Sequence, residues 1–203
     1  MKTKLERFTS GLMLAPLAPL AGLLVFWWGA YAFLPEAWIP VLAITGLVGG
    51  ILADILLLKK LLDRPIGLPL WVAAFLFYSI GVFGFFMGVP VFNTLLAIPA
   101  GFVIGARLAG HTADRQTVHK AAQRTAWFTS AVLALICTAS GLIALASPST
   151  AADLRGMLGL GFEVTPGMLI AFILVGCAVL LSIGWGLSIA ATRITYKFLK
   201  RQV

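Results

Sequence analysis

The chain has 203 residues, of which 61% are hydrophobic and 11% are charged, and its formal net charge is +8. Soluble domains are about 45–50% apolar and about 25% charged. So large an apolar share cannot be hidden in one small soluble core, which excludes a soluble protein and makes the lipid bilayer the main partner. The basic residues form short clusters between apolar runs rather than a continuous patch, which excludes nucleic acid as a partner.

Six apolar segments follow one another along the chain, each long enough to cross a bilayer as a helix. A hydrocarbon core of roughly 30 Å needs about 20 residues at about 1.5 Å per residue. We expect an all-α fold, in which residues 1–203 form a single transmembrane domain with six helices. The predicted spans are approximately 11–34, 38–58, 68–87, 90–109, 126–146 and 166–191.

The segments between these spans differ sharply in charge. Fourteen of the 15 Lys and Arg residues lie on one side of the predicted bundle, and only Arg155 lies on the other. Because basic segments stay in the cytoplasm, both termini are expected to be cytoplasmic, in a prokaryotic cytoplasmic membrane.

Residues 110–125 are expected to form a polar loop. The outer segment 147–165 should hold a short interfacial helix closed by Gly159 or Gly161.

Small residues line one face of the fourth span. Gly101, Gly105 and Ala109 recur every four residues, which places them on one side of a helix. In lipid, such a face lets another helix approach closely. We expect Gly101 and Gly105 to contact the second or fifth helix of the same chain. Docking of a partner subunit or of a second copy is the alternative.

Three prolines lie inside predicted spans. Pro16 and Pro19 interrupt the first span and Pro99 interrupts the fourth. Proline removes a backbone N–H and crowds the preceding turn, so kinks are expected near residues 13–19 and 95–99. Broken helices often line transport sites, although bent helices also occur in passive bundles.

Asp54 is the only acidic residue within a predicted span. Ionisable residues in membranes are candidates for ion or proton coupling. Asp54 also lies five residues before Lys59, near the inner interface, where hydration or a basic partner such as Arg107 would satisfy it. Both interpretations stay open.

A set of polar and aromatic residues is expected near the outer face. Small-ligand pockets combine a few polar groups with aromatic walls. The candidate ligand-binding residues are Tyr31, Glu36, Trp38, Asn93, Arg155 and Glu163. The same residues would equally suit hydrated loops.

Signals for an enzyme are weak. His111, Asp114 and His119 lie in one polar segment, but their spacing matches no strong metal-binding pattern. No nucleophile motif, phosphate-binding loop or pair of catalytic carboxylates occurs within a span. We therefore expect no catalytic residue, no metal and no cofactor.

In its size, six predicted spans and cytoplasmic termini, the chain resembles the substrate-binding components of energy-coupling-factor vitamin transporters. That resemblance implies capture of a small molecule from outside, and docking on a shared membrane subunit through an Ala-x-x-x-Ala pattern in the first helix. The first span here offers Gly11-x-x-x-Ala15 and Ala18-x-x-x-Gly22 instead. We expect a protein that binds or transports a small solute, and the alternatives are an accessory membrane subunit and, less favoured, a membrane enzyme.

Overall fold

The computed structural model describes residues 10, 11, 13–63, 67–86, 88–110 and 113–200. All secondary-structure elements in these ranges are helices. The chain falls into two compact units, Met1–Phe77, called unit 1, and Tyr78–Val203, called unit 2. The boundary lies inside helix α4 (Leu68–Phe85). A single transmembrane domain therefore stays a prediction, and each unit is described by itself.

Five helices are long and apolar enough to cross a membrane, which agrees with a helical multi-pass bundle. They cover Glu36–Asp63, Leu68–Phe85, Val91–Ala109, Arg115–Ala146 and Pro166–Lys200. The first predicted span is different, because its apolar helix α2 (Leu17–Phe33) has only 17 residues. At about 1.5 Å per residue α2 is slightly shorter than a typical hydrocarbon core, so six spans remain a proposal.

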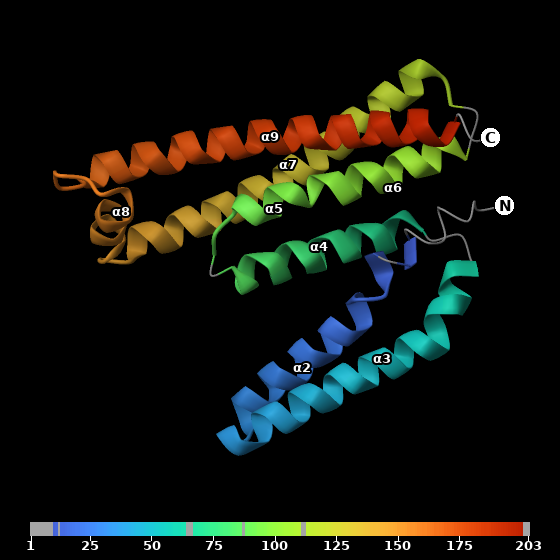
Figure 1. Ribbon diagram of the computed structural model, residues 1–203, viewed down its shortest axis with the longest axis horizontal. Coiled ribbons are helices and arrows are strands. Elements are labelled where there is room, and N and C mark those ends of the chain that lie inside the picture. The colour runs from blue at the N-terminus through green and yellow to red at the C-terminus, as the bar shows by residue number, and fades with distance from the viewer. Residues whose placement is uncertain (1–9, 12, 64–66, 87, 111–112, 201–203) are drawn as a thin grey trace. The chain divides into compact units, whose positions relative to one another are not determined.

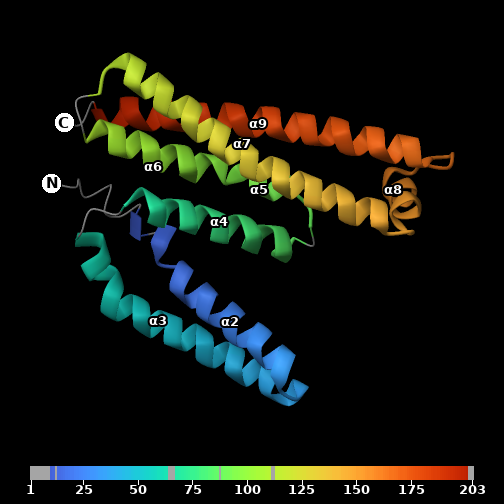
Figure 2. The same cartoon turned by 180° about the vertical axis from the view of Figure 1, so that it is seen from behind.

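Unit 1 is built on a close hairpin of α2 and α3 (Ile39–Asp63), with the short 3-10 helix η1 (Glu36–Trp38) between them (Figure 2). Glycines allow the two backbones to touch. A β-carbon added at Gly46 would lie 2.7 Å from the carbonyl carbon of Gly22, and one added at Gly50 would lie 2.6 Å from the carbonyl carbon of Ala18. The Ala18-x-x-x-Gly22 face is therefore occupied within the chain.

The expected proline kinks are present. Residues 15 and 16 form a turn, and Pro16 precedes the first residue of α2. The fourth predicted span is divided at Leu96 into α5 (Val91–Leu95) and α6 (Ala97–Ala109). Pro99 lies one turn after the break and has no N–H to offer to the carbonyl of Leu95, which explains why the helix is interrupted there.

Unit 2 continues from the end of α4 into α5 and α6, then α7 (Arg115–Ala146), α8 (Thr150–Leu158) and α9 (Pro166–Lys200). Helices α6, α7 and α9 pack side by side, and α8 joins the far ends of α7 and α9 (Figure 1). Gly159 follows α8 with a positive φ of 62°, the left-handed conformation that favours glycine. The hydroxyl of Thr165 accepts a hydrogen bond from the N–H of Met168 at the start of α9.

The prediction of a loop over residues 110–125 is wrong for residues 115–125, which are helical. Helix α7 begins at Arg115, with Asp114 as its N-cap, so all eleven residues from 115 to 125, before the predicted span, are helical. Val118, Ala122 and Ala126 are buried along one face of this extension. Helix α9 likewise continues past residue 191 to Lys200. Packing between these extensions, rather than lipid, keeps them helical.

The glycines of α6 lie in a tight contact with α9. A β-carbon at Gly101 would be 2.6 Å from the carbonyl oxygen of Ser188, and one at Gly105 would be 2.8 Å from the β-carbon of Thr195. Both glycines are buried, and Ala109 at the end of α6 is half-buried. The expectation of a contact with the second or fifth helix is wrong, because the partner is the last helix of the chain.

Candidate binding site

The short turn between α4 and α5 is held by ring stacking and by one buried amide. The rings of Phe86 and Phe92 stack with centroids 3.8 Å apart. Gly88 has φ 84° and its N–H donates to the carbonyl oxygen of Phe83. The side-chain amide of Asn93, 5% exposed, donates to the carbonyl oxygen of Ser79 at 2.7 Å. These contacts place the first turn of α5 firmly against the end of α4.

Four buried side-chain oxygens in unit 2 have no hydrogen-bond partner among the described residues. They are Asn93 Oδ1, Thr94 Oγ1, Ser130 Oγ and Ser188 Oγ, which we call the buried oxygen set. Buried polar atoms in proteins are nearly always paired with protein or ordered water. Leaving one unpaired costs about 1–3 kcal/mol. These four oxygens are therefore the candidate hydrogen-bonding groups in the interior of unit 2.

Contacts at Gly184 fix the level of Thr94 relative to α7 and α9. A β-carbon at Gly184 would lie 3.6 Å from the methyl group of Thr94 and 3.2 Å from a methyl group of Leu133. Ser188 follows Gly184 by one turn of α9, and Ser130 precedes Leu133 by nearly one turn of the antiparallel α7. One helical turn rises about 5.4 Å. The three hydroxyl groups thus lie within about one turn of the same level of unit 2.

Helices α5 and α6 cover only part of α7 and α9. Thr94 packs on Gly184, so Pro90, four residues earlier, is level with residue 180 of the parallel helix α9. Helix α9 begins at Pro166, about 20 Å beyond that level at 1.5 Å per residue. Figure 1 shows the same stagger, with the turn before α5 ending well short of α8.

The parts of α7 and α9 that α5 and α6 leave uncovered are apolar, as expected for helices that cross a membrane. Residues 134–146 and 166–180 contain no charge, and Leu135 and Phe172 are 72% and 56% exposed. These are surfaces for lipid or apolar protein. Non-helical backbone at such depth is tolerated where protein buries it or where it lines a water-filled space. Asn93 and Thr94 are both buried by neighbouring protein, 5% and 4% exposed, at the start of this broken helix.

The predicted outer pocket is not assembled within either unit. Tyr31 and Trp38 are exposed on unit 1, 67% and 55%, and Glu36 lies in the exposed η1. In unit 2, Arg155 donates to the carbonyl oxygen of Leu160 in the exposed connection after α8, and Glu163 is exposed nearby.

Asn93 lies at a different depth from these outer residues. It is level with residue 183 of α9, about 25 Å along the helix from Pro166, where α9 begins and which Glu163 precedes. Asn93 is therefore separated from Arg155 and Glu163 and belongs with the buried oxygens. A shared pocket that includes Tyr31, Glu36 and Trp38 stays a prediction.

The other polar candidates lie elsewhere. Asp54 is half-buried on α3, and no ion pair to it is present among the described residues. Arg107, its expected partner, belongs to unit 2, so that pairing stays a prediction. Asp114 caps α7, and His119 accepts a hydrogen bond from Arg193 at 2.7 Å. His111 lies outside the described residues.

The three hydroxyl groups were missed as binding residues by the sequence reasoning. A signal does exist, because Thr94, Ser130 and Ser188 interrupt apolar spans beside Asn93 or at small-residue faces. Serine and threonine in membrane helices usually bond to the carbonyl of the preceding turn, as Thr192 does to Ser188. Only the packed structure distinguishes a satisfied hydroxyl from an unsatisfied one.

These features define a multi-pass helical membrane protein, with four buried side-chain oxygens in unit 2 that lack a hydrogen-bond partner within the described part of the chain. No protein-family model, curated protein or solved structure matches the chain at a significant level. The site itself therefore carries the functional argument.

Replacing Thr94 with Val is expected to stabilise the solute-free protein. The change keeps the side-chain shape and removes an unpaired oxygen, so the free energy of unfolding should rise by about 1–3 kcal/mol. Thr192→Val is the matched control, because the hydroxyl of Thr192, equally buried, donates to the carbonyl of Ser188 at 2.8 Å. Equilibrium unfolding in detergent should rank Thr94→Val above wild type and Thr192→Val at or below it. The reverse order would show that the Thr94 oxygen is satisfied.

Proposed function

We propose that this chain is a six-span protein of the prokaryotic cytoplasmic membrane, with both termini cytoplasmic, that binds a small polar solute entering from the outer face. The buried oxygen set is the observation that carries this proposal. Asn93 Oδ1 can only accept hydrogen bonds, whereas the three hydroxyls can accept or donate. The solute should therefore present at least one hydrogen-bond donor, to Asn93 Oδ1. The six spans and their orientation rest on the length of the apolar segments and on the charge asymmetry.

The stagger of unit 2 sets the depth of the proposed site. The turn before α5 lies about 20 Å below the outer end of α9, so a polar solute from that side would need a water-filled path over this depth to reach Asn93 and Thr94. Binding near the membrane middle, next to a broken helix, is typical of transport proteins. The accessory-subunit alternative is less favoured, because two of the small-residue faces that could dock a partner are already occupied within the chain. Gly22 packs on α3 and Gly101 packs on α9.

A thermal-unfolding screen of the purified protein against small polyols, amides and amines tests the proposal. A solute at about 100 times its Kd stabilises the folded state by about 2.7 kcal/mol. We expect one chemical class to raise the Tm of wild type and of Thr192→Val, and to leave Thr94→Val combined with Ser188→Ala unchanged. Equal shifts in all three proteins, or no shift with any solute, would contradict a solute site at these oxygens.

A further inference from the structure

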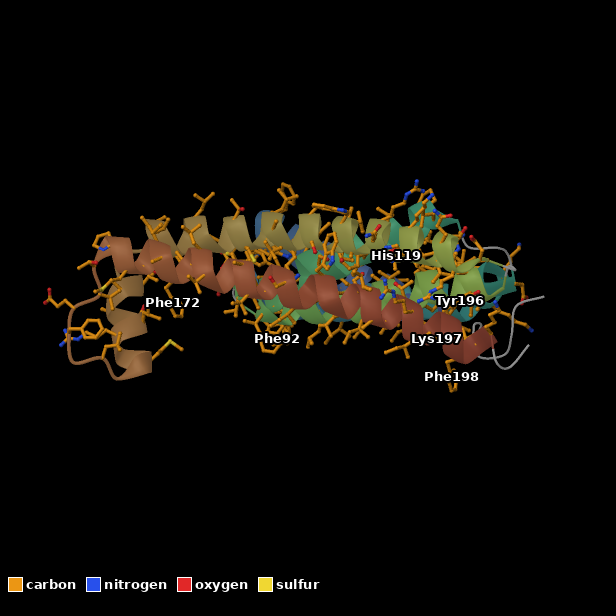
Figure 3. The ribbon with its side chains drawn as sticks, turned by 90° about the horizontal axis from the view of Figure 1, so that it is seen from above. Phe92, His119, Phe172, Tyr196, Lys197 and Phe198 are labelled. Carbon is orange, nitrogen blue, oxygen red and sulfur yellow. The ribbon has the colours of Figure 1, made fainter. Side chains whose placement is uncertain are left out.

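The end of unit 2 opposite α8 is strongly basic, and Figure 3 shows His119, Tyr196 and Lys197 there, away from Phe172. Six Lys and Arg side chains are exposed on the two helical extensions: Arg115, Lys120, Arg124, Arg193, Lys197 and Lys200. Within the described residues 113–125 and 192–200, Asp114 is the only acidic residue. This surface, called the basic end, therefore has a large excess of positive charge.

The single carboxylate is already used by the helix. Asp114 accepts a hydrogen bond from the backbone N–H of Thr117 at 3.0 Å and caps α7. Hydrogen bonding by the side chain and the backbone N–H of Thr117 holds the pKa of Asp114 below its usual value. The Asp114 carboxylate stays ionised at the helix N-terminus, where its negative charge also offsets the positive end of the helix dipole.

Hydrogen bonds to a ring nitrogen and a hydroxyl orient two of the cations of the basic end. Arg193 Nη2 donates to Nδ1 of His119 at 2.7 Å, so that nitrogen is the acceptor and His119 links α7 to α9. Lys200 Nζ donates to the Tyr196 hydroxyl at 3.1 Å, and this hydroxyl donates to the carbonyl oxygen of Ala113 at 2.7 Å. These bonds fix the side chains without cancelling their charge, which leaves the charge available to an anion.

Apolar side chains accompany the cations at the depth of lipid headgroups. Ile194 and Phe198, 65% and 58% exposed, follow Arg193 and Lys197 along α9. The apolar part of α9 ends at residue 191, so Lys197 lies about 9 Å beyond it. The headgroup layer on each side of a bilayer is about 5–8 Å thick. Because lysine and arginine side chains reach along the helix, Arg193 and Lys197 both reach this layer.

We propose that Arg193 and Lys197, together with Lys120 of α7, bind the phosphate groups of anionic phospholipids in the leaflet that meets the basic end. In the orientation proposed above this is the inner leaflet, which is rich in anionic lipid. Ile194 and Phe198 contact the glycerol and upper acyl regions of the same lipids. The inference depends only on membrane insertion and is independent of the solute site.

Lipid retention in nanodiscs of phosphatidylcholine, with or without phosphatidylglycerol, tests this inference. Native mass spectrometry should show phosphatidylglycerol retained on wild type, and anionic nanodiscs should raise its Tm. Each cation near an anionic surface contributes about a fivefold change in binding. Arg193→Gln combined with Lys197→Gln should therefore lose most of the retained phosphatidylglycerol and the associated rise in Tm.

Arg155→Gln is the control, because it removes the same kind of charge at the other end of unit 2 and should retain phosphatidylglycerol as wild type does. Both substituted residues of the double variant are exposed, so its circular dichroism should match wild type. Lys197→Gln alone provides a milder second variant. Phosphatidylglycerol retention that is unchanged in the double variant would overturn the proposal. Displacement of the lipid by inorganic phosphate would assign the site to free phosphate instead.

Discussion

Gly105→Leu is expected to lower the free energy of unfolding by about 1–3 kcal/mol, because it overpacks the contact of α6 with α9. A β-carbon at this position would lie 2.5 Å from the carbonyl oxygen of Thr192 and 2.8 Å from the β-carbon of Thr195. Backbone cannot move aside as a flexible side chain can, so the helices must separate. Their separation would also disturb Ser188, one turn away from Thr192 on the same face.

Gly186→Leu is the control for this change. Gly186 lies on α9 six residues before Thr192, is exposed, and has no atom within 4 Å of an added β-carbon. The two variants carry the same new side chain, so thermal unfolding in one detergent compares their surroundings directly. A Tm for Gly105→Leu equal to that of Gly186→Leu would mean that α6 and α9 do not pack through this glycine.

Gly46→Ala should destabilise unit 1 by about 1–3 kcal/mol even though only one methyl group is added. That methyl group would lie 2.7 Å from the carbonyl carbon of Gly22 and 2.9 Å from the β-carbon of Phe26. Both helices would have to shift, because each approaches the other through main-chain atoms. Hydrogen exchange of the α2 and α3 amides would locate the loss of stability in this hairpin.

Gly49→Ala supplies the matched comparison, since Gly49 lies in the same helix and an added β-carbon there meets nothing within 4 Å. Alanine favours helices over glycine by about 1 kcal/mol, so this variant should be as stable as wild type or slightly more stable. Similar exchange rates in the Gly46 and Gly49 variants would argue against the α2–α3 contact.

The sequence predicted the apolar helices well and their ends poorly. Hydropathy locates the segments that meet lipid, and Pro16 and Pro99 correctly indicated the breaks. Residues 115–125 were interpreted as a loop because they are polar. Val118, Ala122 and Ala126 repeat every four residues there and are buried, so a helical pattern was present beneath the polar composition. Such helices are stabilised by neighbouring protein, which hydropathy does not measure.

Which helices pair could not be predicted from the sequence. The small faces of Gly101 and Gly184 are visible in it, but several faces of this kind occur and their pairing depends on three-dimensional packing. The buried oxygen set was hidden for the same reason. Asn93 was a candidate binding residue because its side chain is a polar amide. Ser130 and Ser188 are recognised at a similar level only when α5, α7 and α9 are placed in register.

The central claim is that polar solutes reach the buried oxygens from the outer face. It is tested most directly by labelling Thr94→Cys with a small membrane-impermeant thiol reagent, in protein that also carries Cys137→Ala and Cys177→Ala. Ile183→Cys, at nearly the same level of α9 and 48% exposed, is the lipid-facing control, because a thiol in lipid does not ionise and react. We predict labelling of Thr94→Cys from the outer side and none of Ile183→Cys. Failure of the reagent to label either Thr94→Cys or Ile183→Cys, or labelling of Thr94→Cys only from the inner side, would contradict the account.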